Sequence, residues 1–271
     1  MAKPGAAEAA VRAAKNNTAV QAAARVGFAV SGLLQLAIGV IAFEVAFHRS
    51  RGEADQSGAL HDLADMPGGP LLLGVCILGF LALGLWLGLS AILPRPHAGT
   101  RLRVLHLADA AKAIVYLTLA STAITVLIRG EDRSAASTAD FSAALLRLPA
   151  GAALLGLLGL AVIGVAGYLV YKGTTRRFER DIRLRPDITE RPVVALGVIG
   201  YVARGVALGG VGVLIVLAAL TSNPARSNGL DAALRAAADL PFGQIILSVI
   251  GVGWLASGVY GFVRAARARM R

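Results

Sequence analysis

Cysteine, histidine and charged residues are all scarce in this sequence. Its 271 residues include one cysteine, Cys76, and four histidines, and 16% of them are charged, against about 25% in ordinary soluble domains. A single cysteine excludes an internal disulfide bond. The histidines, at His48, His61, His97 and His106, lack the spacing of a zinc or haem site, because such sites need several strong ligands held together. We therefore expect neither a metal nor a cofactor.

Catalytic motifs are missing as well. The sequence has no G-x-S-x-G nucleophile elbow, no Walker sequence, and no paired acidic residues at repeated positions in its polar segments. Residues 1–21 have no apolar core followed by a small-residue cleavage site, so we expect the first apolar segment to remain in the protein. These absences predict a protein that is not an enzyme.

Long apolar stretches dominate what is present, and the mean hydropathy is +0.67. A helix needs about 20 apolar residues to cross the hydrocarbon core of a bilayer, and six stretches are long enough. They lie at about residues 22–47, 71–93, 104–128, 152–171, 194–220 and 245–263. The sequence therefore predicts an all-α polytopic membrane protein with six transmembrane helices.

The net charge of +11 is explained by the distribution of the basic residues. Eighteen lie in the two tails and in the segments near 95–103 and 172–191, and seven lie in the three other loops, near 48–70, 129–151 and 221–244. Because short basic loops stay in the cytoplasm, we expect both termini to be cytoplasmic and the protein to lie in the cell (inner) membrane. Anionic lipid headgroups are the expected partners of the densest basic cluster, and nucleic acid is not needed to explain the charge. That cluster is Arg176, Arg177, Arg180, Arg183 and Arg185.

The chain repeats itself three times. A proline, one variable residue and a glycine follow each predicted external loop, and an aromatic residue stands nineteen positions after each proline. Upstream, three glycines of the first unit match three of the third, and the middle unit has alanines there. The turns are Pro67-Gly68-Gly69, Pro149-Ala150-Gly151 and Pro241-Phe242-Gly243; the aromatic residues are Trp86, Tyr168 and Tyr260; and the matched positions are Gly27, Gly32 and Gly39, Ala108, Ala113 and Ala120, and Gly200, Gly205 and Gly212.

The repeat divides the chain into similar parts. We predict a cytoplasmic tail at 1–21, repeats at 22–95 and 96–180, a basic linker at 181–193, and a third repeat at 194–271. Each repeat has two spans, so all three hairpins share one orientation and can surround a pseudo-threefold axis. Since lipid gives helices no hydrophobic reward for association, the glycines are expected to allow close packing. Short amphipathic helices are expected at 58–66, 139–148 and 229–240, capped by Ser57, by Thr138 or Asp140, and by Ser227 or Asn228.

One arginine interrupts the fifth apolar stretch. The repeat places Arg204 level with Ser31 and Lys112. A charge near the bilayer centre costs about 2.5 to 3.5 kcal/mol, so such groups usually face the protein interior and find partners. We expect a polar cluster of Arg204, Asp109 and Lys112, with Ser31, Gln35, His106 and Arg25 nearby. Such a cluster can fix the helix register, with Arg204 reaching towards the headgroups, or form a site for an anion, a proton or a lipid headgroup.

These features resemble one known family. The segment Ala24-Arg25-Val26-Gly27-Phe28, its counterpart Gly200 to Gly205, and the proline-x-glycine turns are similar to those of the domain of unknown function 1206 family. The resemblance implies a six-span membrane protein, of a type found mainly in actinobacteria, with three tandem two-helix units. The middle unit departs from the pattern, because Asp109 and Lys112 replace the aromatic residue and arginine of the third unit.

No activity comes with that resemblance, so two functions stay open. The first is a structural or accessory membrane protein whose partners are lipids, another membrane protein or further copies of itself. The alternative is a small transporter or channel for an ion or anionic solute through the centre of the three hairpins.

Overall fold

The computed structural model describes residues 18–47, 55–92, 102–130, 134–181, 190–223 and 229–267, and these residues contain helices and no strands. Six of the helices are long and apolar enough to cross a membrane, which confirms the six predicted spans. They are α2 (Thr18–Ala46), α4 (Gly69–Ile92), α5 (Leu102–Arg129), α7 (Gly151–Thr174), α8 (Glu190–Thr221) and α10 (Gly243–Arg267).

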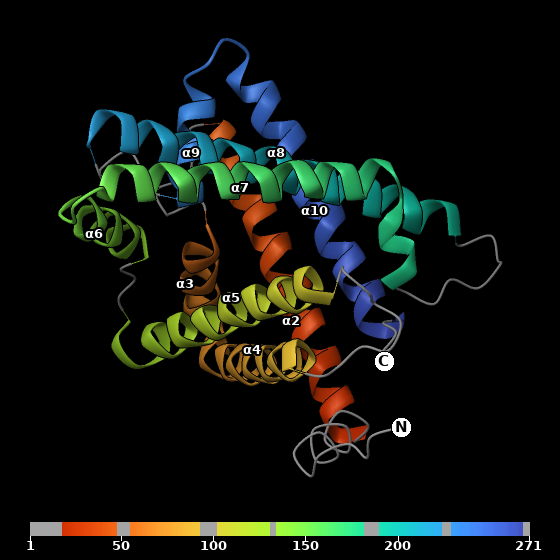
Figure 1. Ribbon diagram of the computed structural model, residues 1–271. Helices are drawn as coiled ribbons and strands as arrows, with labels where there is room; N and C mark the ends of the chain where they lie inside the picture. The colour runs from red at the N-terminus through yellow and green to blue at the C-terminus, as the bar shows by residue number, and fades with distance from the viewer. Residues whose placement is uncertain are drawn as a thin grey trace.

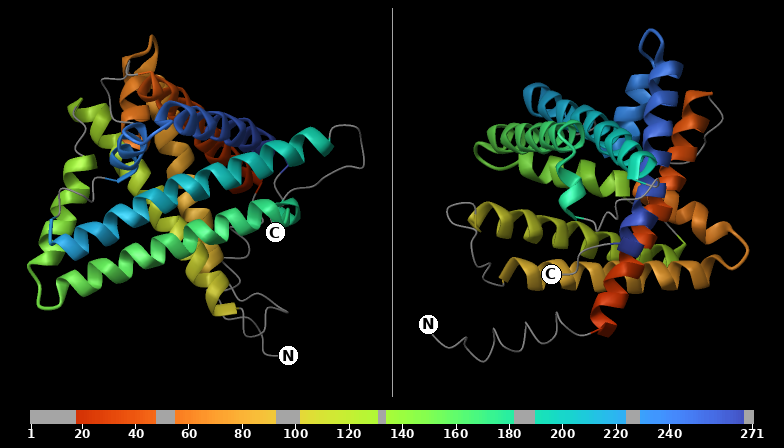
Figure 2. Two further views of the ribbon diagram at one scale, coloured as in Figure 1. Left: turned by 90° about the horizontal axis from the view of Figure 1, so that it is seen from above. Right: turned by 90° about the vertical axis from the view of Figure 1, so that its right-hand side faces the viewer.

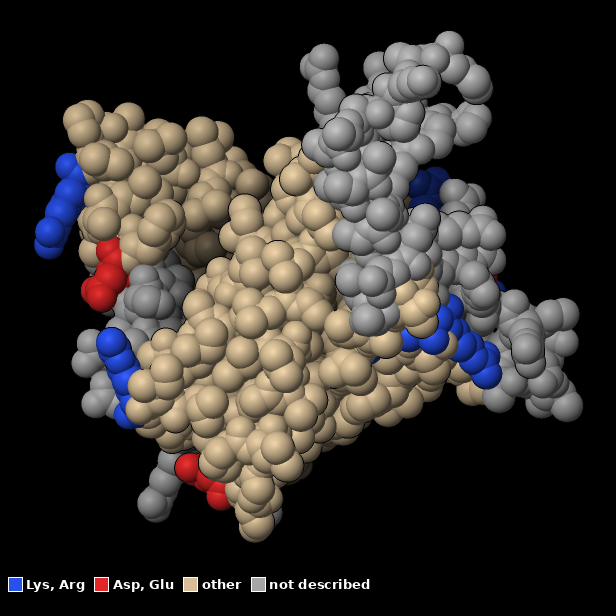
Figure 3. All heavy atoms as spheres, turned by 90° about the horizontal axis from the view of Figure 1, so that it is seen from below, with Lys and Arg blue, Asp and Glu red and all other residues tan. Residues whose placement is uncertain are grey.

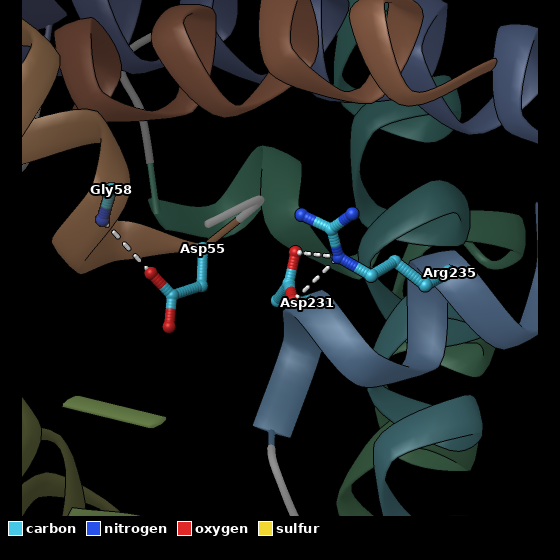
Figure 4. Close-up of polar contacts among 4 residues, drawn as sticks. All are labelled: Asp55, Gly58, Asp231 and Arg235. Carbon is cyan, nitrogen blue, oxygen red and sulfur yellow. Dashed lines mark hydrogen bonds and ion pairs between the residues drawn. The ribbon is translucent and has the colours of Figure 1, made fainter. Parts of the chain in front are cut away.

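A shorter helix lies between the two spans of each repeat, as the sequence predicts. These helices are α3 (Gln56–Asp65), α6 (Ser134–Leu146) and α9 (Gly229–Ala238), and a 3-10 helix, η2 (Arg177–Asp181), follows α7. The predicted caps are wrong where they can be checked. Asp55, not Ser57, caps α3 by accepting from the backbone N–H groups of Ser57 and Gly58 (Figure 4), and α6 begins ahead of Thr138 and Asp140. Ser227 and Asn228 lie outside the described residues.

The three proline-x-glycine turns share one geometry. The middle residue of each turn has a left-handed backbone, with φ of 85° at Gly68, 64° at Ala150 and 64° at Phe242. The glycine that follows donates its N–H to a carbonyl three residues earlier, at 2.8 Å, 2.9 Å and 2.8 Å in the three repeats. A Cβ atom at Gly69, Gly151 or Gly243 would collide with a carbonyl oxygen of the preceding short helix. The last glycine of each turn is therefore explained by lack of space for a side chain. Backbone conformation does not explain it, because the left-handed residue is the one before it.

The most extensive helix interfaces join one repeat to the next. The second span of each repeat packs against the first span of its neighbour, giving the antiparallel pairs α4 with α5, α7 with α8, and α10 with α2. Figures 1 and 2 show the two helices of each pair side by side and the three pairs inclined to one another. The three pairs correspond under the sequence repeat, which gives the fold its pseudo-threefold character.

The repeated small residues lie in these interfaces. A Cβ at Gly32 of α2 would approach the Gly258 carbonyl of α10 to 2.9 Å, and one at Gly205 of α8 would approach the Ala166 carbonyl of α7 to 2.8 Å. Gly84 makes the corresponding approach from α4 to α5, with the Ala113 carbonyl 3.5 Å from its ideal Cβ. Close backbone approach is therefore the shared packing device of the three pairs.

A second set of glycines seals the two spans of the outer repeats. In the first repeat, Gly27 of α2 packs against the backbone of Gly79 in α4. In the third, Gly200 of α8 packs against Ser257 of α10, with a Cβ approach of 2.7 Å to its Cα. Gly39 and Gly212 extend the inter-repeat contacts, against Leu255 and Ile163.

The middle repeat lacks the internal seal. Within the described residues α5 and α7 form no packed interface, and Figures 1 and 2 show them apart. The positions of Gly27 and Gly79 are occupied here by Ala108 and Ala161. Since a methyl group at these positions blocks the close backbone approach seen in the other repeats, the ring of six spans is open on this side.

The central core is apolar over the half nearest the short helices. We call this region the apolar plug; its members come from α2, α3, α4, α5, α8, α9 and α10, and include Ile38, Ile41, Leu60, Leu63, Leu73, Leu234 and Leu247. Charged side chains lie mainly at two edges of the face seen in Figure 3, and the described surface between them is uncharged. That distribution is typical of a protein whose middle lies in hydrocarbon.

Substituting Gly243 with alanine tests the turn geometry. The new methyl group would collide with the Ala238 carbonyl, so we expect the protein to lose about 1–3 kcal/mol of stability and to melt at a lower temperature in detergent. Gly74→Ala is the matched control, because no atom lies within 4 Å of a Cβ there. Equal melting temperatures for the two variants would contradict this account of the turn.

Candidate functional site

Arg204 lies in the protein interior on α8, without a carboxylate partner. Its guanidinium carbon is 5.7 Å from the centre of the Trp254 ring on α10. Its Nε is shielded and has no hydrogen-bond partner, and no ion pair of Arg204 is found among the described residues. A cation–π contact, rather than a salt bridge within the described chain, therefore stabilises this charge.

Ser31 and Gln35 form a separate polar group on α2. The Gln35 side-chain amide donates to the Ser31 hydroxyl at 3.1 Å, and the Ser257 hydroxyl of α10 donates to the Gln35 carbonyl at 2.8 Å. Gln35 and Ser257 are both buried. This chain of hydrogen bonds fixes α2 against α10 and satisfies polar groups that water cannot reach.

Asp109 does not meet Arg204, so the single cluster expected from the sequence is divided. The Asp109 carboxylate pairs with Lys112 one turn along α5, at 3.3 Å, and the Lys112 side chain is 56% exposed. The repeat gives the reason: Asp109 occupies the position of Phe28 and Tyr201, whose rings lie under Arg264 and Lys172 at the junctions between repeats. His106 Nδ1 contacts the Ala91 carbonyl instead.

Arg25, the last member of the expected cluster, is exposed near the start of α2. Of the seven residues grouped by sequence, the structure brings together Ser31 with Gln35, and Asp109 with Lys112. Arg204 stands apart from both pairs.

A cation stacked on an aromatic ring recurs between repeats, and sequence reasoning missed it. The Arg264 guanidinium lies 4.3 Å from the Phe28 ring centre, and the Lys172 ammonium lies 5.2 Å from that of Tyr201. These pairs occupy corresponding positions, at the junctions of the third repeat with the first and of the second with the third. At the remaining junction the positions hold Ser90 and Asp109. Extending the repeat alignment to the ends of the second spans would have revealed the two cation–aromatic pairs.

Two further aromatic side chains pack around Tyr201. Phe178 of η2 is fully buried and stacks on Tyr201, with the ring centres 5.3 Å apart, while Tyr260 meets both rings edge-on. Phe178 also fills the space against Gly197. Phe178 therefore anchors η2, which begins at Arg177, on α8.

A groove of about 610 Å³ lies beside η2 and the first turns of α8. Arg176, Glu179 and Arg191 line its charged part, and aliphatic side chains of α8 line the rest. Arg176 and Arg191 are exposed. The side chains of Arg180, Arg183 and Arg185, which belong to the basic cluster expected from the sequence, lie outside the described part. Among the described residues no group of histidine, cysteine and acidic side chains is placed to hold a metal ion.

Comparison with known proteins identifies the family. The model of the domain of unknown function 1206 family matches residues 26–93, 109–176 and 199–268. This chain belongs to that family. The three matched segments coincide with the three repeats and together cover most of the six spans.

A relative outside the actinobacteria shares most of the chain. An uncharacterised protein of Bacillus subtilis (strain 168), named YxxB, is 30% identical over 244 residues, which cover 89% of this chain and 88% of the relative. No solved structure matches the chain. The molecular function of the family is unknown, so any function must be argued from the site itself.

Removing the Ser257 hydroxyl tests the interhelical hydrogen bond. Ser257→Ala should lower stability by about 0.6–1.7 kcal/mol, the range measured for such bonds between membrane helices, because Gln35 would lose its donor. Ser248→Ala is the control: the Ser248 hydroxyl, on the same helix, donates only to the Gln244 carbonyl of that helix. Thermal unfolding of both variants in detergent measures the difference, and a Ser257→Ala protein as stable as wild type would refute a stabilising role.

Proposed function

We propose that this protein is an accessory component of the cell (inner) membrane that associates with anionic lipids at its cytoplasmic face and catalyses no reaction. In this orientation both termini are cytoplasmic, as the excess of basic residues in the tails and adjoining loops favours. The short helices α3, α6 and α9 would then lie on the external side.

The apolar plug is the observation that carries this proposal. Leu60 and Leu63 of α3, Leu234 of α9 and Leu247 of α10 are all buried in one cluster with the outer half of α2. An ion or polar solute passing through this cluster would lose its hydration without gaining polar partners, which is prohibitive in a low-dielectric interior. The plug therefore favours an accessory role over transport through the centre.

The groove beside η2 supports the lipid part of the proposal. Its charged end has two arginines, Arg176 and Arg191, against one acid, Glu179, and this net positive lining suits a phosphate. Its aliphatic wall, with Val194, Val198 and Ile199, suits the first methylene groups of an acyl chain. Basic residues near an anionic surface contribute about 1 kcal/mol each. Arg177, the residue after Arg176, adds a third basic side chain to this region. Its guanidinium carbon lies 4.9 Å from the Tyr171 ring centre.

Lipid selectivity measured by electron paramagnetic resonance tests this proposal. We expect spin-labelled phosphatidylglycerol to associate with the reconstituted protein more strongly than spin-labelled phosphatidylcholine, and this preference to fall roughly fivefold for each arginine removed at the groove. The variants are Arg176→Gln and Arg191→Gln. Arg129→Gln and Arg147→Gln are controls that should keep the preference. These two exposed arginines lie at the end of α5 and directly after α6, on the side of the protein opposite the groove. No preference in wild type would refute the proposal.

Anion flux from liposomes separates the accessory role from transport. We expect wild type and Arg204→Ala to show the same negligible release of chloride and phosphate, because the apolar plug closes the centre. Flux in wild type that is lost in Arg204→Ala would instead establish a transport path past that residue.

A further inference from the structure

The missing contact between α5 and α7 leaves two helix faces uncovered, and we call the space between these faces the open seam. Its walls are Ala111, Val115 and Thr118 of α5, and Ala161, Val165 and Tyr168 of α7, all of them exposed. The walls are apolar except for hydroxyl groups. The Thr118 hydroxyl donates to the Ile114 carbonyl of its own helix, so it imposes no polar requirement on an occupant.

Comparison between repeats shows that this exposure is particular to the middle unit. Tyr168 is 56% exposed, whereas its counterparts Trp86 and Tyr260 are 6% and 5% exposed. Val165 is 52% exposed, whereas its counterparts Leu83 and Ser257 are buried. The same positions are thus covered by a helix in two repeats and by nothing from the described chain in the third.

Arg204 gives the open seam a chemical preference. On α8, Gly205 packs against α7 and Ala203 packs against Gly253 of α10, so Arg204, which lies between these two residues on the helix, faces the space that the spans enclose. Arg204 is only partly buried, and Nε alone among its nitrogens is both shielded and without a partner. Its terminal Nη atoms therefore reach accessible space while making no hydrogen bond or ion pair within the described chain.

We propose that the open seam is a lateral binding site for one anionic lipid of the surrounding bilayer. The phosphate or carboxylate of the headgroup pairs with Arg204, and an acyl chain lies between α5 and α7. This inference deepens the accessory, lipid-binding function proposed above and rests on it. It adds a specific site inside the protein to the general association at the basic face.

The position of Arg204 favours a lipid over a dissolved anion. The residue lies six positions beyond Val198, the counterpart of Arg25, which is about 9 Å farther along the span at 1.5 Å per residue. A free phosphate would have to cross apolar surface to reach it. A lipid arrives from the side with its chain already in hydrocarbon, and the exposed walls of the seam are apolar like that chain.

A second copy of the protein is the competing occupant, and charge decides against it. The described spans offer no carboxylate on a lipid-facing surface near the level of Arg204, except Asp109, which already pairs with Lys112. A helix from another copy would therefore leave the guanidinium without a counter-charge, whereas an anionic lipid supplies one.

Native mass spectrometry of the full chain tests the site. The protein would be released from nanodiscs that contain equal amounts of phosphatidylglycerol and phosphatidylcholine, and the retained lipids weighed. We expect wild type to retain one phosphatidylglycerol, and Arg204→Gln to retain it about tenfold less or weaker still, as loss of charged hydrogen bonds implies. Arg204→Gln removes a partly buried charge that has no ion pair in the described chain and should fold; its melting temperature checks this.

A seam-filling variant tests the route independently of the charge. Val165→Phe places a ring where the acyl chain would lie and should also lose the lipid. Val213→Phe is the matched control: Val213 is 49% exposed and lies nine residues from Arg204, half a turn out of phase on α8. It should retain phosphatidylglycerol as wild type does.

Four results would overturn the site. Two concern retention: wild type and Arg204→Gln retain phosphatidylglycerol equally, or wild type retains phosphatidylcholine as well as phosphatidylglycerol. The other two are displacement of the lipid by excess inorganic phosphate, and a dimer of the protein that Val165→Phe dissociates. If any of these occurs while the spin-label preference for phosphatidylglycerol persists, the seam site fails and the proposed accessory function stands. If the spin-label preference is also absent, both fail.

Discussion

Close backbone contact between the second span of one repeat and the first span of the next is the interaction on which this structure depends. In lipid, apolar side chains gain little by leaving one hydrocarbon surface for another, so association rests on van der Waals contact and a few hydrogen bonds. Gly32 against Gly258, Gly205 against Ala166, and Gly84 against Ala113 supply that contact at three corresponding places. The short helices and the turns are positioned by these pairs.

Threefold repetition of the interface does not make the protein threefold symmetric. The outer repeats close internally through Gly27 with Gly79 and through Gly200 with Ser257, and the middle repeat has alanines at the first pair of positions. A methyl group on each helix is incompatible with the closest approach seen between Gly27 and Gly79, because closely packed helices tolerate little added volume there. Among the described residues, the two spans that do not meet within a repeat are thus also the ones that expose apolar walls near the partly buried Arg204.

The interior is divided along the spans into two chemical halves. Towards the short helices, aliphatic side chains fill the core completely enough to form a plug. Towards the predicted cytoplasmic ends, cations lie on aromatic rings: Arg264 on Phe28, Lys172 on Tyr201, and Arg204 beside Trp254. Aromatic faces attract cations through the ring quadrupole, so each of these contacts helps to hold its positive group inside the protein.

The sequence by itself determined the six spans, the three repeats, the short helices between spans and the places where backbones meet closely. These properties follow from apolar length and from glycine, both of which act locally. The sequence also predicted the pair of Asp109 with Lys112, because side chains three residues apart on a helix are neighbours on its surface. Only the tertiary structure decided that Asp109 turns away from Arg204, that Ser257 joins Gln35, and that α5 and α7 stay apart. Those outcomes depend on the rotation of each helix about its axis and on which neighbour it meets, and these are set by contacts between residues distant in the chain.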